Sequence, residues 1–362
     1  MASLRLRDRD AIVTHEGLIF RVFGYTHPPD AYICDLEYAP AKLFRSSNPK
    51  APRLGGYVKF YEDEAWHFIQ TSFPQYLIPH KPLGRRVLGV RHCDIAGVRR
   101  PQEALKKLLE KPAQDPLVEA LRRVLEATVF ATGLSVEDFG VFGSLLHDFY
   151  HPLFSDIDII VYGRENLEQI RRRLQELYAD EASGFSNEFE TDAPVMGKLW
   201  RYKNLSPEEF VWHQRRKLIY GVFRDEASER AIKVEFEPVK AWSETRNEYG
   251  EIRKITREGW VKALLMVKDD SEAPFMPSIY LVESIDILEG PKVGDIERIV
   301  SYIEEFRMQA WKDEVVYVEG NLEKVETSRG SFHQITLTYG PKYYNQVIKI
   351  ANPQLLTSNP LP

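Results

Sequence analysis

One segment, FGVFGSLLHDFYHPLFSDIDIIVYG at residues 139–163, constrains this chain more than any other. It contains Gly143-Ser144, eleven further residues, and then Asp156 and Asp158 on alternate positions of an apolar run. Two carboxylates on alternate residues of a strand point to the same face, where they repel each other and readily bind a divalent cation. A Gly-Ser turn that opens a helix offers backbone amides and a hydroxyl to phosphate. The segment therefore predicts a metal site beside a phosphate site.

This spacing resembles the signature of the DNA polymerase β-like nucleotidyltransferase superfamily, which is an apolar residue, Gly-Gly or Gly-Ser, nine to thirteen residues, and Asp-apolar-Asp or Glu. Residues 142–159 satisfy every position of that signature. The resemblance implies that Asp156 and Asp158 bridge two Mg²⁺ or Mn²⁺ ions. It also implies that Gly143 and Ser144 hold the phosphates of an NTP substrate.

A third carboxylate is implied by the same resemblance, on a later strand within a basic-apolar-acid-apolar run. The run KVEF at residues 233–236 places Glu235 there, and Glu237 is the alternative on the same face of that strand. This carboxylate would bind the metal ion that lowers the pKa of the attacking hydroxyl. A cationic contact to the triphosphate is also implied, for which the candidates are Arg215, Arg216 and Lys217.

The pattern of elements predicts an α+β chain with three domains. A β-rich N-terminal domain is expected over residues 1–100, a nucleotidyltransferase core with a mixed sheet and helices over 101–240, and a β-rich domain over 241–362. In the last domain the order strand, strand, helix over 296–308, strand, strand is compatible with a small OB-like barrel.

Composition limits the class of protein. The hydrophobic content is 43%, and no apolar run approaches the roughly 18 residues that a membrane-spanning helix requires. The charged start lacks an apolar leader, so we expect a cytoplasmic protein that binds no membrane. Cys34 and Cys93 are too few for a disulfide framework. Sparse Asn and Gln beside many charges favour a thermophile, and the flanks resemble uncharacterised archaeal proteins that carry nucleotidyltransferase domains.

The formal charge of −6 is distributed unevenly. Residues 1–100 and 195–268 each carry five more basic than acidic side chains, whereas residues 101–194 and 269–362 are acidic. An acidic catalytic segment suits metal binding, and basic flanks suit a polyanionic partner. A charge-neutralising contact between domains explains the same distribution.

Three functions are therefore compatible with the sequence. The first is transfer of an NMP to a nucleic-acid 3′ end, with RNA as the expected acceptor. The second is nucleotidylation of a protein or a small molecule. The third is a non-catalytic nucleic-acid-binding or antitoxin-like protein that keeps only the fold. A separate hypothesis is a zinc site on one helix face that carries His147 and His151.

Overall fold

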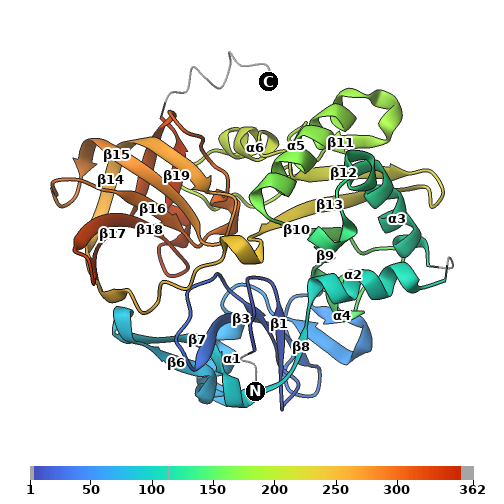
Figure 1. Ribbon diagram of the computed structural model, residues 1–362, viewed down its shortest axis with the longest axis horizontal. Helices are drawn as coiled ribbons and strands as arrows, with labels where there is room; N and C mark the ends of the chain where they lie inside the picture. Colours follow the sequence, from blue (N-terminus) through green and yellow to red (C-terminus); the bar gives the residue numbers. More distant parts are fainter. Residues whose placement is uncertain (1–3, 113–114, 352–362) are drawn as a thin grey trace. The chain divides into compact units, whose positions relative to one another are not determined.

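The structure, a computed structural model, describes residues 4–112 and 115–351 (Figure 1). The chain forms two compact units, one of Met1–Phe185 with Val222–Gly250 and one of Ser186–Gly221 with Glu251–Pro362. Several sheets and few helices confirm the predicted α+β class. The domain boundaries at residues 100 and 240 stay a prediction.

The N-terminal part is β-rich, as predicted. Its eight-stranded sheet has the order β4-β5-β3-β2-β1-β8, and β7 pairs with β3 and β6. The strands are β1 Ala11–Thr14, β2 Ile19–Val22, β3 Ala31–Pro40, β4 Pro52–Arg53, β5 Tyr57–Lys59, β6 Leu77–His80, β7 Arg85–Arg91 and β8 Ile95–Arg99. Helix α1, Glu64–Ser72, follows β5. Alternation along β3 buries Tyr32, Cys34 and Leu36 in a core that also contains Phe20 and Ile69.

A five-stranded mixed sheet follows in the chain, with the order β11-β12-β13-β10-β9. Its strands are β9 Phe139–Val141, β10 Ile157–Tyr162, β11 Phe185–Asn187, β12 Tyr220–Asp225 and β13 Arg230–Val239. The helices of this stretch are α2 Pro101–Glu110, α3 Pro116–Thr128, α4 Gly143–His147, α5 Arg164–Ala179 and α6 Pro207–Arg215. Strand β10 runs parallel to β13 and antiparallel to β9.

Local sequence rules explain where two of these helices begin. Asp115 caps α3, because its carboxylate accepts hydrogen bonds from the amides of Leu117 and Val118. Ser206 and Glu209 form a reciprocal capping box at the start of α6.

The C-terminal strands form a closed barrel with OB-like connectivity. Strand β14 pairs with both β15 and β17, β16 joins β15 to β18, and β18 pairs with β17, so each of the five strands has two neighbours. The β16–β18 pair is the parallel one. This five-stranded ring is the architecture expected for an OB-like barrel. The strands are β14 Ile252–Glu272, β15 Ser278–Glu289, β16 Arg298–Ser301, β17 Val315–Thr327 and β18 Ser331–Leu337, and β19 Val347–Ile350 adds to β17.

The predicted helix over residues 296–308 is wrong. This stretch forms β16 and a short 3-10 turn at Glu304–Phe306. Ile299 and Ser301 are fully buried, and β16 has a partner strand on each edge. Backbone pairing on both edges therefore makes this stretch a strand in place of the expected helix.

None of the helices in residues 4–112 and 115–351 is both long enough and apolar enough to cross a membrane.

We predict that Gly140→Ala destabilises the fold. Strand β9 passes so close to the start of α2 that a Cβ on Gly140 would lie 2.6 Å from the Pro101 Cβ and 2.7 Å from its carbonyl carbon. Because backbone must move to make room, we expect the free energy of unfolding to fall by about 1–3 kcal/mol in chemical denaturation. Gly97→Ala is the matched control, since a Cβ there meets nothing within 4 Å. Equal stability of the two variants would contradict this packing.

Candidate active site

Gly143 and Asp158 meet at the turn between β9 and α4. The Phe142 amide donates to the Asp158 carbonyl at 2.9 Å. Gly143 has a φ of +58°, and a Cβ built on it would lie 2.4 Å from Asp158 Oδ2. Glycine is therefore required on two counts, its left-handed backbone and the close approach of the carboxylate. The structure brings together the two halves of the sequence signature.

The predicted acids share one face of the sheet. Asp158 lies opposite Glu235 in the parallel β10–β13 register, and Glu237 follows on the same face. Asp156, just before β10, is exposed, whereas Asp158 and Glu235 are half-buried. Burial, followed by the negative charges of Glu237 and Asp156, raises the pKa of Asp158 from 3.8 to about 7. The carboxylates are thus close enough to repel one another.

Arg9 is a member of this site that the sequence did not reveal. Its Nη2 lies 2.6 Å from Glu237 Oε2, and both side chains are buried. Its guanidinium also lies over the Phe142 ring, 4.9 Å from the centroid. The positive charges of Lys59 and Arg9 lower the pKa of Asp158 against the effects of burial and repulsion. The N-terminal segment therefore supplies cations to the carboxylates.

The carboxylates fit a hard divalent cation by their chemistry. Oxygen ligands suit Mg²⁺ and Mn²⁺, and such an ion would relieve the repulsion that raises the pKa of Asp158. Asp156, Asp158 and Glu235 would hold it. Over residues 4–112 and 115–351, no three or more Asp, Glu, His or Cys side chains are gathered closely enough to form a metal site already.

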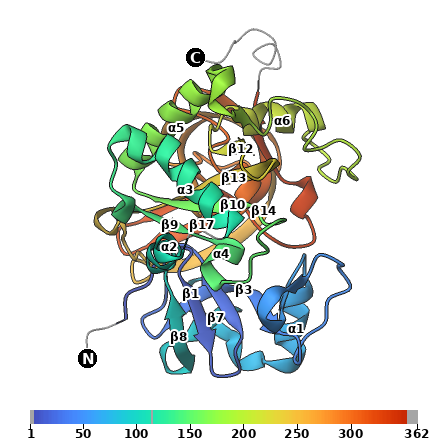
Figure 2. The ribbon, with the colours of Figure 1, turned by 90° about the vertical axis from the view of Figure 1, so that its right-hand side faces the viewer.

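The N-terminal sheet covers part of the acid-bearing face. In both views α4 lies beside β1 and β3 (Figures 1 and 2). Apolar residues from these elements form one buried cluster with the far end of β10, comprising Ala11, Ile19, Tyr38, Phe142, Leu146, Phe149, Ile160, Tyr162 and Val239. The acids are therefore left at the amino-terminal end of β10, next to the Gly-Ser turn.

The loop between α4 and Asp156 is held from both sides. Lys111 binds Asp148 at 2.9 Å, and the Tyr150 hydroxyl donates to Asp115 at 2.6 Å. Arg230 donates to the carbonyls of Pro152 and Ser155 at 2.8 and 3.2 Å. These contacts, from α2, α3 and β13, fix the loop that delivers Asp156.

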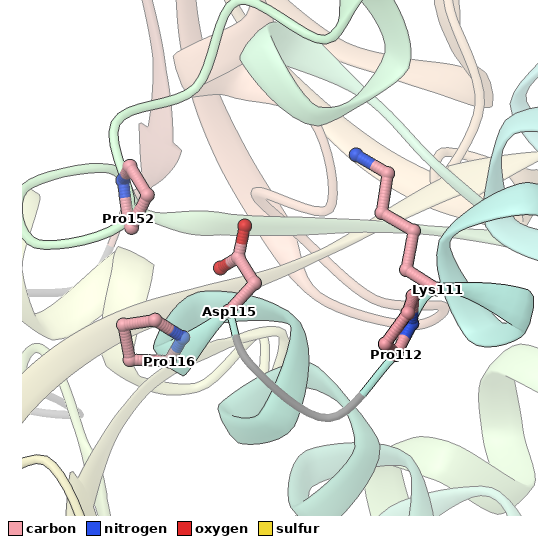
Figure 3. Close-up of a pocket in the computed structure, with 5 residues that line it drawn as sticks. All are labelled: Lys111, Pro112, Asp115, Pro116 and Pro152. Atoms are coloured by element: carbon pink, nitrogen blue, oxygen red, sulfur yellow. The ribbon is translucent and has the colours of Figure 1, made fainter.

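A pocket of about 280 Å³ lies beside this loop (Figure 3). It is lined by Lys111, Pro112, Asp115, Pro116 and Pro152. None of the predicted site residues lines it, so it is separate from the carboxylates.

The cations predicted from the sequence lie around the end of α6. Lys217 is fully buried, and its Nζ donates to Gln214 Oε1 at 2.6 Å and to the Glu305 carbonyl at 2.7 Å. Its ammonium is therefore committed to protein acceptors. Arg216 forms an ion pair with Glu314, and Arg215 is half-buried. Roles of Arg215 and Arg216 in triphosphate binding stay predictions.

The helix face expected for a zinc site at His147 and His151 does not exist. Helix α4 ends at His147, and Asp148 has a φ of +60°. His147 is buried and accepts from Arg99 at its Nδ1, while His151 Nδ1 accepts from the Leu153 amide. The two imidazoles serve local structure instead.

Comparison with known proteins agrees with this geometry. Residues 121–258 match the family described as "Nucleotidyltransferase domain". An uncharacterized protein of Methanocaldococcus jannaschii is 26% identical over 354 residues, which cover 96% of this chain and 99% of that protein. No solved structure matches the chain.

We predict that Asp158→Asn stabilises the metal-free protein at neutral pH. The pKa of Asp158 is about 7 in the folded state against 3.8 ordinarily, so its contribution to stability is complete below about pH 4 and declines as pH rises to about 7. The amide of the variant does not ionise, so its contribution to stability does not decline as pH rises. The stability difference between variant and wild type should therefore grow over this range and then level off, reaching about 2–4 kcal/mol.

Denaturation with EDTA at pH 4, 5.5, 7 and 8 measures this difference. Asp286→Asn removes the same charge from an exposed position and serves as the control. A difference that is independent of pH would contradict the burial and repulsion assigned to Asp158.

Proposed function

We propose that this chain, which carries a nucleotidyltransferase domain of the polymerase β-like superfamily, transfers an NMP from an NTP to a hydroxyl acceptor. Pyrophosphate is the second product, and an RNA 3′ end is the proposed acceptor. The observation that carries this proposal is the approach of the Asp158 carboxylate to the Gly143 turn. That approach would place metal ligands and phosphate-binding amides at one point.

In the proposed reaction, the acceptor hydroxyl oxygen forms a bond to the α-phosphorus, and the bond from that phosphorus to the bridging oxygen breaks. The proton of the hydroxyl passes to solvent. Bound Mg²⁺ would neutralise charge on the phosphates and lower the pKa of the hydroxyl. Asp156, Asp158 and Glu235 would hold the cation, while the backbone at Gly143 and Ser144 would position the leaving phosphates.

A nucleic-acid acceptor is supported by features outside the catalytic sheet. The OB-like barrel has an architecture that many oligonucleotide-binding proteins use. Residues 1–100 carry an excess of basic side chains, which suits a polyanion. Both features favour an extended, negatively charged acceptor.

We predict that Asp156→Ala and Asp158→Ala abolish transfer in a folded protein. Loss of a metal ligand should cost at least about 3 kcal/mol of barrier, which is more than a hundredfold in rate. The assay follows label from each α-labelled NTP, with Mg²⁺ or Mn²⁺, into tRNA, single-stranded RNA, protein or small molecules. Label in RNA supports the proposal, and label in protein or small molecules supports nucleotidylation of those acceptors. No label anywhere would favour a binding protein without catalysis.

We also predict that the two glutamates on β13 have separable roles. Glu235→Gln should lower transfer while leaving stability close to wild type, because Glu235 is half-buried opposite Asp158. Glu237→Gln should instead destabilise the protein by about 1–3 kcal/mol, because it removes the carboxylate that lies 2.6 Å from the buried Arg9 and leaves the more distant Asp8 carboxylate at 3.9 Å. Thermal denaturation and the transfer assay measure both effects. Transfer lost in a stable Glu237→Gln protein and kept in Glu235→Gln would reverse the assignment.

A further inference from the structure

Strand β5 of the N-terminal sheet lies beside the loop that follows the Gly-Ser turn. Tyr57, at its start, stacks on Phe149 with ring centroids 4.5 Å apart and an interplanar angle of 25°. Successive side chains of a strand alternate, so Lys59 lies on the same side of β5 as Tyr57. The side chain of Lys59 therefore extends from the side of the strand that contacts the loop after the Gly-Ser turn.

The neighbouring strand fixes the same placement independently. Lys59 is directly opposite Tyr38 in the antiparallel β3–β5 pair, so the two side chains share one face. The Tyr38 ring lies 5.1 Å from the His147 ring and 5.7 Å from the Phe149 ring. These contacts hold the Lys59 backbone against α4 and the residues that follow it.

The charge of Lys59 acts on both sides of this junction. Burial, followed by the charges of Arg99 and Lys59, lowers the pKa of His147 to about 3. The charge of Lys59 also opposes the burial and repulsion that raise the pKa of Asp158. Lys59 is half-buried. Across the described residues its ammonium has no ion pair within 4.0 Å and no hydrogen bond to a side chain.

The other cations near the site are already engaged. Arg9 is paired with Glu237. Arg99 donates to the ring and carbonyl of His147. Arg53 donates to the carbonyls of residues 50–52. Lys59 therefore differs from its neighbours in having an ammonium that protein acceptors do not occupy.

We infer that Lys59 is a phosphate-contacting residue of the active site, contributed by the N-terminal β-rich part of the chain. The inference rests on the proposed function, and it names a residue outside residues 121–258, which match the nucleotidyltransferase family. The phosphate belongs either to the NTP or to the backbone of a nucleic-acid acceptor. A lysine ammonium is a flexible point charge that suits either source.

The test measures binding separately from transfer. Wild type, Lys59→Ala, Lys59→Gln and Lys59→Arg are titrated with ATP, AMP, inorganic tripolyphosphate and single-stranded RNA by calorimetry, with Ca²⁺ as the divalent ion. Lys42→Ala is the control, because it removes one positive charge from an exposed position of the same sheet region. Circular dichroism and melting temperature establish that each variant is folded.

For a nucleotide contact, Lys59→Ala and Lys59→Gln should bind ATP and tripolyphosphate about tenfold more weakly or worse, with a much smaller effect on AMP. Lys59→Arg should restore most of the affinity, and Lys42→Ala should bind like wild type. A loss confined to RNA would instead assign the contact to the acceptor backbone. Unchanged affinity for all four ligands in folded Lys59→Ala would overturn the inference.

The same titrations keep the two proposals apart. Wild-type protein that binds tripolyphosphate through Lys59 but transfers no NMP would sustain the inference and refute the transferase. If the wild-type protein transfers NMP, and Lys59→Ala transfers it at the same rate and binds the ligands with the same affinity, the transferase proposal is sustained and the inference on Lys59 is refuted. Wild-type protein that binds none of the ligands would overturn both.

Discussion

Burial of carboxylates that also repel one another near the start of β10 is the constraint on which the rest of the site depends. Asp158 is pressed against the Gly143 turn while the charges of Glu237 and Asp156 act on it. A cluster of this kind is costly to bury unless cations compensate it. Arg9 provides one such cation through its ion pair with Glu237. Metal binding at the exposed end of the cluster would provide another.

This constraint gives the N-terminal sheet a role in the chemistry as well as in packing. Its apolar residues cover the Ile160 end of the sheet face, and its cations reach the acidic end. The nucleotidyltransferase match begins at residue 121, yet Arg9 and the β5 strand lie well before it. A fragment restricted to the matched residues would expose Ile160 and leave Glu237 without Arg9. The relative from Methanocaldococcus jannaschii aligns over 96% of this chain, N-terminal part included.

The features that can be inferred from the sequence are those with local causes. Gly143, the two aspartates and β10 follow from spacing and alternation within one short segment, and the starts of α3 and α6 follow from their capping residues. Contacts across long stretches of chain had no such signal. Arg9 and Glu237 are separated by 228 positions, and Lys59 lies on a three-residue strand whose facing depends on β3. The predicted helix at residues 296–308 failed for the same reason, because pairing with β15 and β18 makes its first half a strand.

A crystal structure of the protein with Mn²⁺ and a non-hydrolysable NTP analogue tests the central claim most directly. Anomalous scattering locates the metal independently of the protein coordinates. We predict an anomalous peak in contact with the carboxylates of Asp156 and Asp158, with the analogue's phosphates at the Gly143 turn. A metal and nucleotide bound elsewhere, with these carboxylates contacting neither, would contradict it.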